Sequence, residues 1–231
     1  MRLNDRPKTM ALTLRVASHL LRYPDRQLRA QLPELRAALG RESALSRTRR
    51  DELCALIDFL RAQDPFAAEA AYVELFDRGR TTSLHLFEHV HGDSRERGPA
   101  LVDLARTYAQ AGLYLAPDEL PDYLPVVLEF ASTLPATAAR AFLGEMAHLF
   151  NALVAALTAR RSRYACVLGA LLDLAGERAQ PIPPAIEEPL DATWEEPPAF
   201  GGCGMSGQSA PSTVAPLHYV PRARTIEGEP A

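Results

Sequence analysis

Long apolar runs and cysteines are both scarce in this chain of 231 residues, and each scarcity excludes a class of protein. No apolar run approaches the ~20 residues that a helix needs to cross a bilayer, so we expect no membrane insertion. Arg15 and His19 interrupt the apolar stretch near the N-terminus, which therefore lacks the pattern of a signal peptide. The three cysteines, Cys54, Cys166 and Cys203, are odd in number and far apart, which argues against a disulfide framework. We therefore expect a cytoplasmic protein.

An excess of positive charge is also missing. The formal net charge is −4, from 25 Lys and Arg residues against 29 Asp and Glu residues. A nucleic-acid surface needs an uncompensated basic stripe that neutralises phosphates. Two arginine-rich groups occur, at 47–50 and 160–163, and we attribute them to helix ends, where basic side chains complement the dipole. The sequence therefore predicts no nucleic-acid partner.

Sustained period-two alternation appears nowhere, whereas helical periodicity continues up to Gly176. Apolar residues recur at helical spacing in the segments 28–39, 53–60, 68–76, 101–108, 136–161 and 164–175. Asp64 followed by Pro65 predicts an N-cap and a first helical residue, and Gly112 and Gly176 each follow a predicted helix end. We expect an all-α, single-domain helical bundle over residues 1–176, with 136–161 as one long helix.

Residues 177–231 differ in composition from the bundle. They hold much of the chain's proline and an excess of acidic side chains, together with a glycine-rich stretch at 201–204. Such a segment buries too little apolar area to offset its ordering entropy, so we expect a largely disordered tail. The segment 190–200 contains Trp194, the only tryptophan of the chain. It is either part of a linker or a short segment that docks onto the bundle or a partner.

The segment Tyr72–Gly98 concentrates charge, histidines and aromatic residues between two ordinary helices. A helix is expected to end at Gly79, where glycine can take the left-handed conformation. Thr81, Thr82 or Ser83 is then expected to cap a short helix over 85–90.

One hypothesis for this short helix is a zinc hydrolase, because His85, Glu88 and His89 form the H-x-x-E-H pattern of inverted metalloproteases. Two histidines four residues apart can bind one Zn²⁺, and Glu88 can act as the base. The hypothesis is weak, since no third protein ligand is identifiable and a short helix after a turn positions ligands poorly. In the alternatives, the histidines hydrogen-bond to neighbouring groups, or the mixed charges form a surface that recognises a protein.

The segment 72–95, which begins YVELFDRGR and continues with SLHLFEHVHGDSR, resembles the signature block of the NarJ/NarW nitrate reductase chaperones, which belong to a wider helical family with the TorD and DmsD chaperones. The segments LYLAPDELPDYLP (113–125) and LDATWEEP (190–197) are similar to further motifs of that family. The resemblance spans nearly the whole chain. One departure is Tyr123, since relatives often have a histidine after the aspartate of this motif, and any role of that histidine does not transfer.

The resemblance implies a non-catalytic chaperone that binds the N-terminal peptide of the apo catalytic (alpha) subunit of a respiratory nitrate reductase. It also implies contacts with the alpha-beta complex and with cofactor-synthesis proteins. No cofactor is expected to be tightly bound, because the chaperone assists delivery of molybdenum bis-pterin guanine dinucleotide to the client before membrane attachment. A sibling chaperone for another molybdoenzyme is the alternative.

We expect a groove beside the segments 72–97 and 119–130. Its expected partner-binding residues are Glu74, Phe76, Asp77, Arg78, Arg80, His85, Phe87, Glu88, His89, Asp122 and Tyr123.

Overall fold

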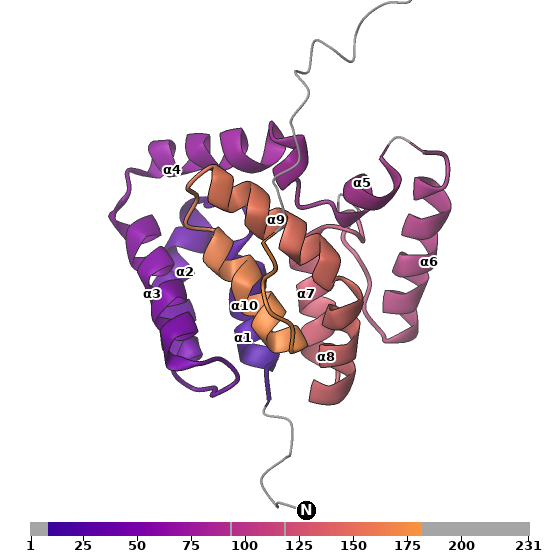
Figure 1. The fold of residues 1–231 in the computed structure, drawn as a ribbon, viewed down its shortest axis with the longest axis horizontal. Coiled ribbons are helices and arrows are strands. Elements are labelled where there is room, and N and C mark those ends of the chain that lie inside the picture. Colours follow the sequence, from indigo (N-terminus) through magenta and orange to yellow (C-terminus); the bar gives the residue numbers. More distant parts are fainter. Residues whose placement is uncertain (1–8, 93, 118, 182–231) are drawn as a thin grey trace, which may run out of the picture. The chain divides into compact units, whose positions relative to one another are not determined.

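A computed structural model describes residues 9–92, 94–117 and 119–181 of the chain, and the regular elements in these residues are all helical (Figure 1). The α-helices are α1 (Ala11–Leu20), α2 (Arg26–Leu39), α3 (Arg47–Ala62), α4 (Pro65–Tyr72), α5 (Leu86–His91), α6 (Arg97–Gln110), α7 (Leu124–Thr133), α8 (Ala136–Glu145), α9 (Ala147–Ala159) and α10 (Ala165–Ala175). Two short turns lie between α4 and α5, the π-helix η1 (Val73–Asp77) and the 3₁₀ helix η2 (Arg80–Thr82). The all-α prediction is confirmed.

The main core is organised around α10. Helices α3, α8 and α9 pack against it, while α1 packs along α7 and α2 joins α1 to α3 (Figure 1). Because α10 is covered on several sides, it is apolar around most of its circumference, and Leu168, Leu171 and Leu172 are fully buried. At Gly169 an added Cβ would lie 2.8 Å from the guanidinium of Arg49, so a larger residue here would displace the end of that side chain.

Local signals in the sequence mark several helix ends correctly. The Asp64 carboxylate accepts a hydrogen bond from Ala67 N at 3.0 Å, and Pro65 occupies the first position of α4. Gly112 (φ 80°) and Gly176 (φ 86°) follow α6 and α10 in the left-handed region that favours glycine.

The segment 136–161 is not one long helix, so that prediction was wrong. It divides at Met146 into α8 and α9, which meet at a bend of 64°. Both halves pack against α10, which a straight helix of this length does not allow. Within the described residues, no individual helix has both the length and the apolar character of a membrane span, although α8 and α9 together pass that test as a bent pair.

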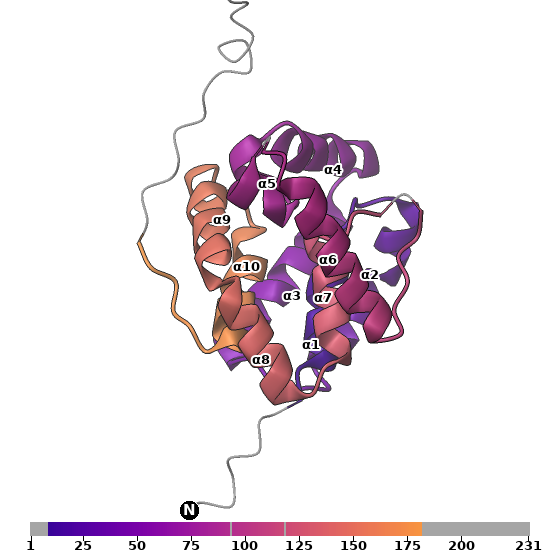
Figure 2. The same ribbon diagram turned by 90° about the vertical axis from the view of Figure 1, so that its right-hand side faces the viewer.

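Helices α5 and α6 form an arm at the side of the bundle, at the right in Figure 1 and turned toward the viewer in Figure 2, which we call the α5–α6 arm (residues 86–110). Tyr108 is the buried residue of α6, and it forms a small second core with Val126 and Phe130 of α7. The tail proposed for residues 177–231 lies, from residue 182 onward, outside the described residues. The proposed docking segment 190–200 lies entirely outside them.

Candidate partner-binding site

The signature segment begins where α4 widens into the π-turn η1. Arg78 N donates to Val73 O at 3.1 Å, a bond over five residues that marks the widened turn. Such turns occur frequently at functional sites. Tyr72 and Phe76 remain buried against the core, whereas Asp77 at the end of the turn is exposed. The turn therefore separates two packing side chains from a carboxylate that remains accessible.

Gly79 follows this turn for a reason that the sequence did not reveal. Its backbone (φ −92°, ψ 102°) is extended, so the predicted left-handed conformation was wrong. A Cβ at this position would lie 2.8 Å from Leu75 O and would collide with the Thr82 hydroxyl, which hydrogen-bonds to the same carbonyl. Close approach of η1 and η2, and not an unusual φ angle, therefore requires glycine here.

Two motifs that are distant in the sequence join at a short backbone ladder. Leu86 N donates to Asp122 O at 3.0 Å, and Leu124 N donates to Leu84 O at 2.8 Å. The ladder places His85 opposite Tyr123, with their ring centroids 5.3 Å apart. The structure therefore brings together the two regions in which the sequence analysis placed its candidate residues.

The side chain of Asp122 holds this junction together. Its side chain is fully buried, and its Oδ2 accepts from Phe87 N at 3.1 Å, which caps the N-terminus of α5. Its other oxygen lies 3.5 Å from His85 Nδ1, and Arg97 Nη2 lies 3.8 Å from Oδ2. Of the residues 81–83 expected to cap this helix, Ser83 accepts from His85 N at 3.2 Å, ahead of the first turn, whereas the bond to the first turn of α5 itself comes from Asp122.

The H-x-x-E-H residues are occupied by other partners. His85 precedes α5 and faces Asp122, and the Nε2 of His89 lies 2.8 Å from Ser83 O. Glu88 accepts from the Ser83 hydroxyl and, at 3.2 Å, from Arg97. The described residues contain no cluster of three or more His, Cys, Asp or Glu side chains that could hold a metal ion. The hydrogen-bonding alternative describes this geometry, and the zinc hypothesis does not.

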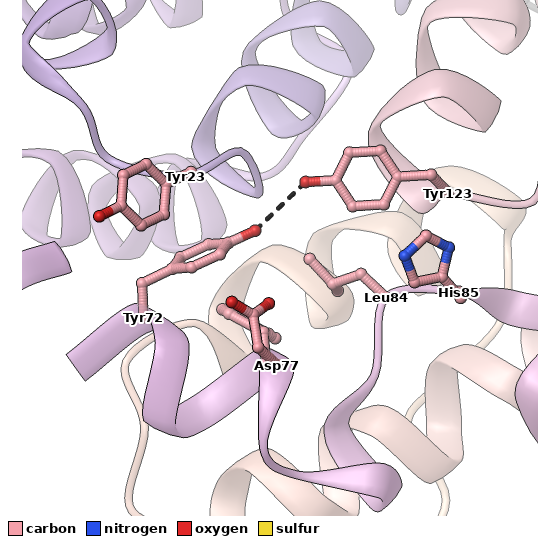
Figure 3. Close-up of a pocket in the computed structure, with 7 residues that line it drawn as sticks. Tyr23, Tyr72, Asp77, Leu84, His85 and Tyr123 are labelled. Atoms are coloured by element: carbon pink, nitrogen blue, oxygen red, sulfur yellow. Dashed lines mark hydrogen bonds between the residues drawn. The ribbon is translucent and has the colours of Figure 1, made fainter. Parts of the chain in front are cut away.

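A pocket of about 230 Å³ opens beside this junction, between the end of α1, the π-turn and the start of α7 (Figure 3). We call it the tyrosine pocket; it is lined by Tyr23, Tyr72, Phe76, Asp77, Leu84, His85 and Tyr123. The Tyr72 hydroxyl donates to Leu21 O at 2.7 Å and lies 3.2 Å from the Tyr123 hydroxyl. Burial, reinforced by neighbouring groups, raises the pKa of Tyr72 far above its ordinary value, so this phenol stays protonated.

The predicted site residues fall into three groups. Phe76, Asp77, His85 and Tyr123 line the tyrosine pocket, although Phe76 is largely buried. Glu88, His89 and Asp122 belong to the internal network, and Phe87 packs against the core. Glu74 and Arg78 are exposed and form an ion pair at 3.1 Å, and Arg80 is exposed beside them. The sequence analysis did not identify Tyr23 as a site residue. Nothing in the sequence of the turn after α1 indicates that this side chain lies near residues 77 and 123.

Comparison with known structures first defines the class of protein. A crystal structure described as that of a redox enzyme maturation protein from Archaeoglobus fulgidus has the same fold, with a TM-score of 0.51 over 73% of this chain and 94% of that chain, at 22% sequence identity. The chain thus has the helical fold of that maturation protein.

Sequence relatives then identify the family. The family described as nitrate reductase delta subunit matches residues 23–168. The nitrate reductase molybdenum cofactor assembly chaperone NarJ of Escherichia coli (strain K12) is 40% identical over 86% of this chain and 90% of its own length. NarW of the same strain is 39% identical over 79% and 80%, and NarJ of Bacillus subtilis (strain 168) is 35% identical over 70% and 86%. The chain therefore belongs to the nitrate reductase delta subunit family, whose NarJ- and NarW-type members are assembly chaperones and not catalysts.

Proposed function

We propose that this chaperone binds the N-terminal segment of the apo catalytic subunit of a respiratory nitrate reductase in the cytoplasm. It holds the subunit until molybdenum bis-pterin guanine dinucleotide is inserted, and it leaves before the complex attaches to the membrane. The observation that carries the proposal is the 40% identity to a nitrate reductase molybdenum cofactor assembly chaperone over 90% of that protein.

The proposed docking surface is the exposed rim of the signature segment around the tyrosine pocket. Asp77, His85 and Tyr123 contribute the pocket lining that a peptide can reach, and Glu74, Arg78 and Arg80 lie on the exposed part of the same segment. Asp122, Glu88, His89 and Phe87 act indirectly, by fixing α5 and the ladder. Charges of both signs at such a rim favour recognition of a polypeptide over a polyanion.

The pocket is suited to a part of a peptide and not to the cofactor itself. Pockets for drug-sized ligands and cofactors typically enclose ~300–1,000 Å³, and the tyrosine pocket encloses about 230 Å³. A bis-pterin dinucleotide exceeds this volume. The chaperone then acts on the client, because a protein that prefers the open apo state raises the population of that state without any covalent step. Cofactor insertion closes the client and removes the preference.

The proposal is tested by isothermal titration calorimetry of the full chain against two synthetic peptides. One is the N-terminal segment of a nitrate reductase catalytic subunit, and the other is the N-terminal segment of an unrelated molybdoenzyme. We expect saturable one-to-one binding of the first peptide and binding of the second that is weaker by about tenfold or more, or ~1.4 kcal/mol. Binding of the second peptide alone would identify a sibling chaperone and overturn the proposal.

A further inference from the structure

The tyrosine pocket contains an acidic side chain, that of Asp77. The carboxylate of Asp77 points into the pocket toward the tyrosines (Figure 3), and it has no hydrogen-bond or ion-pair partner among the described residues. Two nearby arginines pair with other acids: Arg22 lies 2.8 Å from Glu129 and 3.8 Å from Glu119, and Arg78 pairs with Glu74. The pocket therefore presents a carboxylate that a ligand can engage.

The hydroxyl groups of Tyr72 and Tyr123 meet at the pocket (Figure 3). Tyr72 has one hydroxyl hydrogen and donates it to Leu21 O, so the hydrogen in the Tyr72–Tyr123 bond must come from Tyr123. Tyr23 donates its hydroxyl hydrogen to Glu69 at 3.2 Å. All three phenolic hydrogens are thus directed at protein acceptors, and the oxygen lone pairs that remain on Tyr72 and Tyr123, with the Asp77 carboxylate, favour a ligand group that donates hydrogen bonds.

The walls of the pocket are aromatic faces and edges. The rings of Tyr23 and Tyr72 meet edge to face with centroids 5.6 Å apart, and Phe76 lies 4.8 Å from Tyr72. Aromatic faces attract a cation within about 6 Å of the ring centroid, and more strongly where water is excluded. Burial, the largest contribution, and in smaller part the charge of Asp77 raise the pKa of Tyr123 against the opposing effects of Tyr72 and Arg22.

We propose that the tyrosine pocket receives one basic side chain, a lysine ammonium or an arginine guanidinium, from the client's N-terminal segment. The proposal rests on the proposed function and adds the chemistry of its specificity. A volume of about 230 Å³ accommodates the head of one side chain. Asp77 supplies the ion pair, the tyrosine oxygens accept the remaining donors, and Tyr23, which is 42% exposed, covers the apolar stem.

The test measures the affinity of the full chain for the client peptide and for derivatives in which each Lys is replaced by norleucine or each Arg by citrulline. These replacements remove charge and keep the shape of the side chain. We expect Asp77→Asn to weaken binding of the unmodified peptide by about tenfold or more, because a charge-assisted bond is lost. One modified peptide should show the same loss with the wild-type chain and no further loss with Asp77→Asn.

The matched control is Asp51→Asn, which neutralises an exposed, ion-paired acid on α3 outside the docking surface and should change the affinity less than about twofold. Asp77 is exposed, so its variant should keep the wild-type denaturation midpoint, which is measured in parallel. This inference alone is overturned if Asp77→Asn binds the unmodified peptide as tightly as the wild-type chain does. It is also overturned if the wild-type chain binds every Lys- or Arg-modified peptide as tightly as the unmodified one. A wild-type chain that binds no nitrate reductase peptide overturns the proposed function together with it.

Discussion

The helical bundle and the α5–α6 arm are held in place by different forces. The bundle buries a continuous apolar core from α1 to α10, in which residues such as Leu14, Phe150 and Leu168 are fully buried. The arm buries Tyr108 in a second core of three residues and Leu86 in the main core, and it is further fixed by the ladder and by Asp122. Few buried apolar contacts mean a low local opening free energy. The candidate site lies at the seam of these two regions, so the more mobile region borders the more rigid one where a client is expected.

The largest expected effect is a truncation in the bundle core. Phe150→Ala should lower the free energy of unfolding by about 3–5 kcal/mol, because a fully buried ring is lost and a cavity remains. Urea denaturation followed by circular dichroism measures this loss. Phe66→Ala is the control, since Phe66 is 80% exposed and its removal should cost less than about 0.5 kcal/mol. Equal effects of the two variants would contradict the proposed role of the bundle core.

A smaller and local effect is expected from Asp122→Asn. The variant keeps the size of the side chain but removes the charge that faces His85 and Arg97. We expect a loss of about 1–3 kcal/mol, confined to the arm, because the hydrogen bond to the α5 backbone is weakened in a buried position. Amide hydrogen exchange should accelerate in α5 and α6 and remain slow in α10. In the control Asp103→Asn, at an exposed site on α6, exchange should be unchanged.

Removing one hydroxyl group from the second core tests how much a single hydrogen bond stabilises α6. Tyr108 donates to Pro121 O at 2.9 Å, which ties α6 to the segment before α7. Tyr108→Phe should raise hydrogen exchange in α6 by an amount equivalent to about 1 kcal/mol, the usual contribution of one hydrogen bond. Tyr114→Phe removes the same group from a residue that is 84% exposed and should have no effect. A global loss of stability in Tyr108→Phe would show that arm and bundle unfold as one unit.

The smallest expected effect is a pH dependence of the bundle. Burial in the first place, and Arg22 in the second, lower the pKa of His19 below its ordinary value. The unfolded chain therefore binds a proton more readily than the folded chain, and stability should fall as the pH decreases below about 6.5. The urea midpoint, followed from about pH 7 to about pH 5, should decrease less in His19→Gln than in the wild type. An identical decrease in both would exclude His19 as the cause.

The sequence predicted those features that local interactions determine. The Asp64 cap, the glycines after α6 and α10 and the apolar stripe of α2 each depend on residues within a few positions, and the structure contains all of them. The bend at Met146 depends instead on packing against α10. The cap of α5 depends on Asp122, which is far away in the sequence.

The candidate site was predictable in its location but not in its geometry. The signature segment and the motif around Tyr123 do meet, as the expected groove required. The direction of Asp77 follows from the π-turn, and the participation of Tyr23 follows from the packing of α1. Neither the π-turn nor the position of the α1–α2 turn has a signature in the amino-acid pattern.

The crowding at Gly79 limits how client preference can be redesigned. No side chain fits at position 79 between Leu75 O and the Thr82 hydroxyl, so the backbone of this turn keeps its conformation only with glycine at this position. Engineering a chaperone for a different client must therefore leave position 79 alone and vary the outward positions 74, 77 and 78, which are solvent-accessible and can change charge without disturbing that conformation.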